Sequence, residues 1–113
     1  MDEAIAYIKW ALGKEELLVQ LSEEAGELAK AALKMRRTMS ERNPTPITFE
    51  DAVKNLIEEI ADVLFCLSLI GYAPESLEKE LGEIRAYKTV RWAGRLGYPP
   101  KKVEDCWNPE VDA

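Results

Sequence analysis

The sequence contains no histidine and only two cysteines, and both scarcities exclude classes of site. Di-iron carboxylate bundles use Glu-x-x-His helices, so a chain without histidine cannot build that centre. Cys66 and Cys106 are too few for a disulfide framework, and Cys66 reads as an apolar core residue. No secretory signal opens the chain, and no apolar run approaches the roughly 20 residues of a membrane span. We therefore expect a cytoplasmic protein with no membrane partner.

Basic residues are also fewer than acidic residues. Lys and Arg number 15 against 21 Asp and Glu, which gives a formal net charge of -6. A nucleic acid polymer is thereby disfavoured as a main partner, because phosphate backbones need a basic surface. Hydrophobic residues make up 47% and charged residues 32% of 113 residues, which fits one globular domain over residues 1–113.

Strand-like alternation and internal repeats are absent, whereas helical periodicity is strong. We expect four helices, over residues 2–12, 14–37, 48–71 and 74–92. Gly13 should interrupt the first pair, and Thr48 should cap the third helix with Asp51 three residues on. Gly71 should end that helix, and residues from about 99 to 113 look like an extended tail. The predicted fold is an all-α four-helix bundle.

The second of these helices places a carboxylate where an apolar side chain is expected. Its apolar stripe, at the helical period, consists of Leu17, Leu21, Leu28 and Met35. Glu24 falls within this stripe and Glu27 at its edge, whereas Glu23 points away. An acid on the core-facing line of a helix breaks the binary pattern and needs a reason.

The third helix has the same pattern of acids on its apolar stripe. Its stripe consists of Ala52, Leu56, Val63 and Ile70. Glu59 falls within it, Asp62 lies at its edge, and Glu58 faces outward. If the two stripes pack together, four carboxylates converge in a largely apolar site, at a high cost in free energy if they are unpaired.

Metal ions are the expected counter-charge for this cluster. The lysines nearest in sequence, Lys30 and Lys54, are predicted to lie on other faces. Ligation by oxygen alone favours a hard ion, Mg²⁺ or Mn²⁺, which shares its ligands readily with phosphates.

The fourth helix adds cations. Its apolar line runs through Leu77, Leu81 and Ile84, and the same line continues to Lys88 and Arg95, with Arg91 on one edge. Together with metal ions, such cations could neutralise a polyphosphate. Two blander interpretations stay open: the acids form a solvated face, or they pair with Lys88, Arg91 and Arg95 in a structural network.

At this point the residues resemble a family. The stretches SEEAGELAKA and LIEEIADVLFCL carry Glu23-Glu24-x-x-Glu27 followed by Glu59-x-x-Asp62. This pattern resembles the signature of the MazG-like all-α nucleoside triphosphate pyrophosphohydrolases, whose superfamily includes dimeric dUTPases, dCTP pyrophosphatases and phosphoribosyl-ATP pyrophosphohydrolases. The likeness covers roughly residues 17–92. The YKTVRW stretch is similar to a basic segment of MazG-type members, although the asparagine often found before its lysine is absent.

The resemblance implies hydrolysis of a nucleoside triphosphate between the α- and β-phosphates, as part of nucleotide-pool housecleaning.

 The products would be a nucleoside monophosphate and pyrophosphate. Carried onto this chain, the ligands of Mg²⁺ are Glu24, Glu27, Glu59 and Asp62. Glu23 would support these ligands or activate water. Lys88 and Arg91 match the basic positions of the family, and together with Arg95 they make up the predicted substrate-binding residues.

The resemblance also implies a homodimer or homotetramer, and the apolar run over residues 60–70 agrees, because one small bundle would leave part of it exposed. Two alternatives to this function remain. One is a phosphoribosyl-ATP-type pyrophosphohydrolase, and the other is a non-catalytic helical-bundle interaction protein with structural ion pairs.

Overall fold

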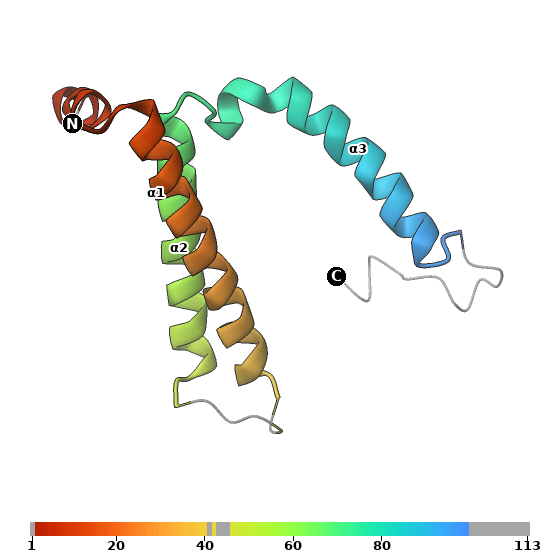
Figure 1. The fold of residues 1–113 in the computed structure, drawn as a ribbon. Helices are drawn as coiled ribbons and strands as arrows, with labels where there is room; N and C mark the ends of the chain where they lie inside the picture. The colour runs from red at the N-terminus through yellow and green to blue at the C-terminus, as the bar shows by residue number, and fades with distance from the viewer. Residues whose placement is uncertain (1, 41, 43–45, 100–113) are drawn as a thin grey trace. The chain divides into compact units, whose positions relative to one another are not determined.

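The computed structural model describes residues 2–40, 42 and 46–99, and all regular elements in these ranges are helical (Figure 1). They are α1 (Asp2–Thr38), α2 (Phe49–Leu69), the 3₁₀ helix η1 (Pro74–Leu77) and α3 (Glu78–Arg95). The chain divides into two compact units, Met1–Leu77 and Glu78–Ala113. The all-α prediction is confirmed for the described residues. The predicted tail lies outside them from residue 100 onward, as does Cys106.

α1 consists of two helices joined at Gly13. This glycine has φ 73° and ψ 167°, a conformation that residues with a side chain rarely adopt. The predicted interruption is therefore confirmed. In Figure 1 the first turns of α1 run in a different direction from the rest of the helix. Ile5 and Ile8 in these turns pack against the core formed by Leu17, Leu69 and Ile70.

α2 begins and ends at the predicted signals. The hydroxyl of Thr48 accepts a hydrogen bond of 3.1 Å from the backbone N–H of Asp51, which caps the helix. At the other end Gly71 has φ 92°, and the N–H of Tyr72 donates to the carbonyl of Leu67 at 2.8 Å. This is a Schellman ending, which satisfies carbonyls that the helix leaves free.

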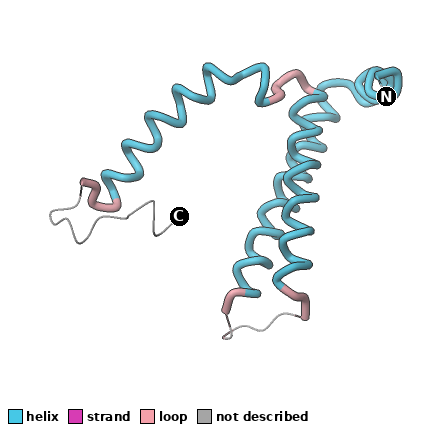
Figure 2. The backbone as a smooth tube through the Cα atoms, turned by 180° about the vertical axis from the view of Figure 1, so that it is seen from behind, coloured by secondary structure: helices cyan, strands magenta, loops and turns pink. Residues whose placement is uncertain are grey.

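α1 and α2 lie side by side and antiparallel as a helical hairpin, which both backbone views show (Figures 1 and 2). The buried residues come from the two predicted stripes or their edges: Leu17, Ala31, Ala52, Cys66, Leu69 and Ile70. Ala31 is 1% exposed and Ala52 0%, and these small side chains permit close approach of the two helices. The hairpin therefore partly covers the faces on which the acids lie.

The fourth predicted helix differs from the observed one at both ends. Pro74 opens η1 rather than an α-helix, and α3 continues past Trp92 to Arg95. Gly94 lies within this helix, and Gly97, two residues beyond its end, has φ 95°, a positive value at which the helical path cannot continue. None of the described helices is long and apolar enough to cross a membrane.

Candidate metal centre

The facing stripes bring together three of the four predicted metal ligands. Glu24 on α1 and both Glu59 and Asp62 on α2 each offer a carboxylate oxygen, and these oxygens lie within 4.8 Å of one another. All three residues are partly buried. The convergence expected from the sequence is therefore present for these three side chains.

The fourth predicted ligand, Glu27, lies beside this group rather than within it. Glu27 is exposed, and its Oε1 lies 3.3 Å from Nζ of Lys30. The prediction that Lys30 lies on another face was wrong, because residues three apart on a helix are neighbours and a lysine stem reaches back one turn. With side chains 74% and 53% exposed, this pair contributes little stability.

Gln20 supports the site in a way that the sequence reasoning missed. Its Nε2 donates a hydrogen bond of 2.8 Å to Oε1 of Glu24. The signal was the spacing of four residues, at which a glutamine and an acid meet on a helix surface. This bond restricts the orientation of one candidate ligand. Glu23 and Glu58 are exposed, in agreement with their predicted outward positions.

The three acids form a cluster of like charge. Partial burial raises the pKa of Glu59, and the charges of Asp62, Glu24, Glu27 and Glu58 raise it further. Burial also raises the pKa of the Cys66 thiol, as do Glu24 and Asp62, so this thiol stays protonated near neutral pH. The one ion pair among the described residues is Lys30–Glu27. The three clustered acids thus have no ion-pairing side chain in that part of the chain.

This donor set fits a hard divalent cation. It consists of carboxylate oxygens from two helices, which is the ligand type that Mg²⁺ and Mn²⁺ prefer. A dication would also remove the repulsion that raises the pKa of Glu59.

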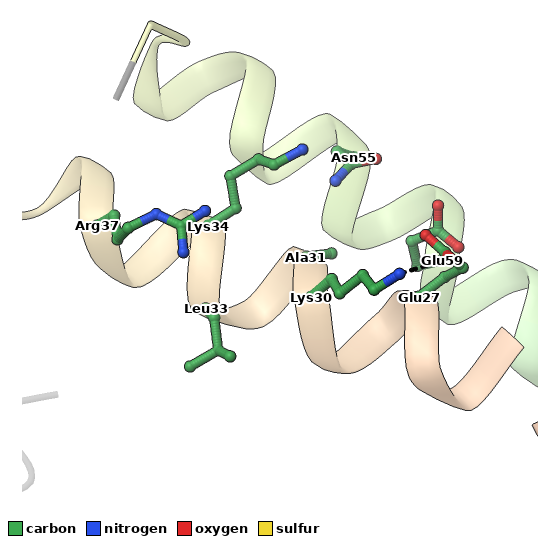
Figure 3. Close-up of a pocket in the computed structure, with 8 residues that line it drawn as sticks. All are labelled: Glu27, Lys30, Ala31, Leu33, Lys34, Arg37, Asn55 and Glu59. Atoms are coloured by element: carbon green, nitrogen blue, oxygen red, sulfur yellow. Dashed lines mark hydrogen bonds and ion pairs between the residues drawn. The ribbon is translucent and has the colours of Figure 1, made fainter. Parts of the chain in front are cut away.

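Two hollows of opposite character lie along the hairpin beside the acids. The first, of about 290 Å³, is lined by Glu27 and Glu59 together with the cations Lys30, Lys34 and Arg37 (Figure 3). The second, of about 230 Å³, is mainly apolar. Its lining includes Glu24 and Asp62 at one side, with Ile8, Leu12 and Phe65. The acid cluster therefore borders a basic surface on one side and an apolar surface on the other.

The predicted substrate-binding cations lie on α3. Lys88, Arg91 and Arg95 are exposed and, with Trp92, line a hollow of about 340 Å³ on that helix. The guanidinium of Arg91 lies 5.5 Å from the centre of the Tyr87 ring. The three cations thus share one face of α3, as predicted. The acids belong to the unit Met1–Leu77 and the cations to the unit Glu78–Ala113, so a site that they share stays a prediction.

No protein-family model, curated protein or solved structure matches this chain.

Proposed function

We propose that this protein is a Mg²⁺-dependent nucleoside triphosphate pyrophosphohydrolase of the MazG-like type. The reaction would convert a nucleoside triphosphate to a monophosphate and pyrophosphate. The observation that carries this proposal is the convergence of Glu24, Glu59 and Asp62, whose oxygens lie within 4.8 Å of one another. The family resemblance supplies the reaction, and the chemistry of the donor set supports a hard metal ion.

Mg²⁺, or Mn²⁺ in its place, would be held by Glu24, Glu59 and Asp62, with Glu27 beside them. A bound divalent ion neutralises the charge that develops on phosphate oxygens during hydrolysis. Gln20 would hold the carboxylate of Glu24 in place. The chain contains no histidine, so a carboxylate is the proposed acceptor of the proton of the attacking water. The resemblance indicates Glu23 either for this role or as support for the metal ligands.

The two hollows beside the acids support a nucleotide substrate. Phosphates require cations, whereas a nucleobase presents a flat apolar face that stacks on aromatic rings. Phe65 is 46% exposed, so its ring is available for such a contact in the apolar hollow. Lys88, Arg91 and Arg95 would bind the polyphosphate.

The proposed assembly is a four-helix bundle formed as a homodimer or homotetramer. Large apolar side chains on α2 and α3 support it, since Ile57, Leu64, Leu81 and Ile84 are all more than 40% exposed. Association of chains would cover such side chains.

A panel of nucleoside triphosphates, with phosphoribosyl-ATP included, tests the reaction. We expect release of pyrophosphate and the matching monophosphate in Mg²⁺, and none in excess EDTA. Release of orthophosphate would contradict cleavage between the α- and β-phosphates. Absence of turnover across the panel would contradict the enzymatic proposal.

The Lys30–Glu27 pair favours one second candidate, a non-catalytic helical bundle in which acids serve as ion pairs. Thermal unfolding with and without Mg²⁺ separates the two. A specific site stabilises the folded protein by linkage, by about 2.7 kcal/mol at 100 times the dissociation constant. The ion-pair protein would show little change in Tm.

A further inference from the structure

The cation-lined hollow on the hairpin contains residues that the proposed reaction does not yet use. Lys30, Lys34 and Arg37 lie on successive turns of α1, four and three residues apart, and all three line it. Figure 3 shows Lys34 extending from α1 toward Asn55 on α2, whereas Leu33 points away from the other side chains. Cations from one helix and an amide from the other therefore border one space.

Lys34 and Arg37 differ from ordinary surface cations in their surroundings. Both are partly buried, whereas Lys30 is exposed. Lys30 pairs with Glu27, but no acidic partner lies within ion-pair distance of Lys34 or Arg37 among the described residues. Two partly buried positive charges on one wall attract an anion, and their donors and the amide of Asn55 suit phosphate oxygens.

The hollow also reaches the acids, because Glu27 and Glu59 line its other end. An anion bound by Lys34 and Arg37 would therefore lie next to the proposed metal centre. A polyanion fits this arrangement better than a single small anion, since one end can meet the cations while another end meets a metal ion.

We propose that Lys34, Arg37 and Asn55 form a polyphosphate subsite on the hairpin itself, in addition to the cations of α3. That the polyphosphate belongs to a nucleotide rests on the proposed function. The subsite would bind the phosphate end of the ligand next to the acid cluster and would thereby orient it along the hairpin.

The position of Arg37 also has a structural explanation. Arg36 and Arg37 both lie in the last turn of α1, where positive charge interacts favourably with the helix dipole. Arg36 is exposed and does not line the hollow. Arg36→Met is therefore a matched control for Arg37→Met, because it removes the same charge from the same turn.

The test measures binding of inorganic tripolyphosphate by calorimetry to the full chain, in excess Mg²⁺ and again in EDTA. The EDTA measurement includes the Glu59→Gln background, in which one repelling carboxylate is absent. Far-UV circular dichroism checks that each variant is folded. We expect Lys34→Met and Arg37→Met to weaken binding by about tenfold each, the loss of one charge-assisted hydrogen bond. Arg36→Met should change it less than about twofold.

Equal losses in Arg36→Met and Arg37→Met would overturn the proposal, because they would show attraction to general positive charge. Absence of tripolyphosphate binding in every condition would overturn it as well. The two proposals can fail separately. If no nucleotide of the panel were hydrolysed but tripolyphosphate binding still depended on Lys34 and Arg37, the proposed enzyme would be contradicted and the subsite supported. Nucleotide turnover with no role for these two residues would contradict the subsite alone.

Discussion

The hairpin and α3 carry the same kind of face, an apolar line interrupted by charge, but only the hairpin covers it. On α1 and α2, Leu17 is 2% exposed and Ala52 0%. No described residue of α3 is buried, and Leu81 and Ile84 on its apolar line are 43% and 51% exposed. The difference teaches that periodicity identifies the face of a helix, whereas the partner that covers the face depends on which helices pack together. Ten residues separate α1 from α2, and only η1 and a few further residues separate α2 from α3, so the length of a connection does not decide which face is covered.

The charged residues of the hairpin and of α3 also differ in their exposure to water. The three clustered acids of the hairpin are partly buried, and this burial, together with the charges of the neighbouring acids, raises the pKa of Glu59. The cations of α3 are exposed to water, which screens them. A change of charge should therefore have larger consequences in the hairpin than on α3.

The largest effect is expected from substitutions of the partly buried acids. Glu24→Gln and Glu59→Gln should each reduce turnover to background in saturating Mg²⁺ while the protein stays folded, because each removes a charged ligand from the proposed metal centre. Steady-state pyrophosphate release measures this loss. Glu58→Gln, one residue away and exposed, is the control and should retain activity. Near wild-type turnover in either of the first two variants would contradict the ligand assignment.

A smaller effect is expected from substitutions of the exposed cations of α3. Lys88→Met and Arg91→Met should lower kcat and kcat/KM together by about 10²-fold, because the lost interactions strengthen as charge moves to the leaving pyrophosphate. Lys79→Met, on the same helix but off the apolar line, is the matched control. If kinetics stayed unchanged while Tm fell, these two cations would be structural.

The exposed apolar side chains predict self-association. Light scattering at micromolar concentration should give a mass that is two or four times the 12.8 kDa of one chain. Ile84→Glu should lower this mass to that of one chain, because a charge would be placed on the apolar line of α3. Lys79→Glu, which places the same acid elsewhere on the helix, should leave the mass unchanged. A mass near 12.8 kDa for the wild type would contradict the prediction.

The smallest effect concerns metal-free stability. The folded state raises the pKa of Glu59, so between the unfolded and folded pKa values the folded protein holds more protons and loses stability as pH rises. Glu59→Gln removes this penalty. In EDTA the variant should therefore have a higher Tm than wild type at pH 7, and the difference should vanish below about pH 4. A difference that did not change with pH would point to packing instead of charge.

Features that depend on one helix at a time were predictable. The stripe containing Glu24, the stripe containing Glu59, the cap at Thr48 and the stop at Gly71 all follow from the helical period and local hydrogen bonding. Gly13 was predictable because a glycine between two periodic segments marks a break.

Features that depend on register or side-chain reach were not predictable. The bond from Gln20 to Glu24 and the pairing of Lys30 with Glu27 depend on rotamers. The hollow lined by Lys34 and Asn55 depends on how far α1 is shifted along α2, which no single-helix pattern records. The opening of η1 at Pro74 escaped prediction because a proline fits the first turn of either type of helix.

The conformation of Gly13 has a stereochemical consequence. A Cβ added there would meet no atom within 4 Å, so only the backbone angles oppose a side chain. The mirror image of these angles lies in the extended region that L-residues favour, which means that a D-amino acid would suit this position. Translation supplies no such residue, so glycine is the single encoded choice that lets Ile8 turn back onto the end of the hairpin and form a wall of the apolar hollow. Handedness, rather than space, therefore fixes this residue.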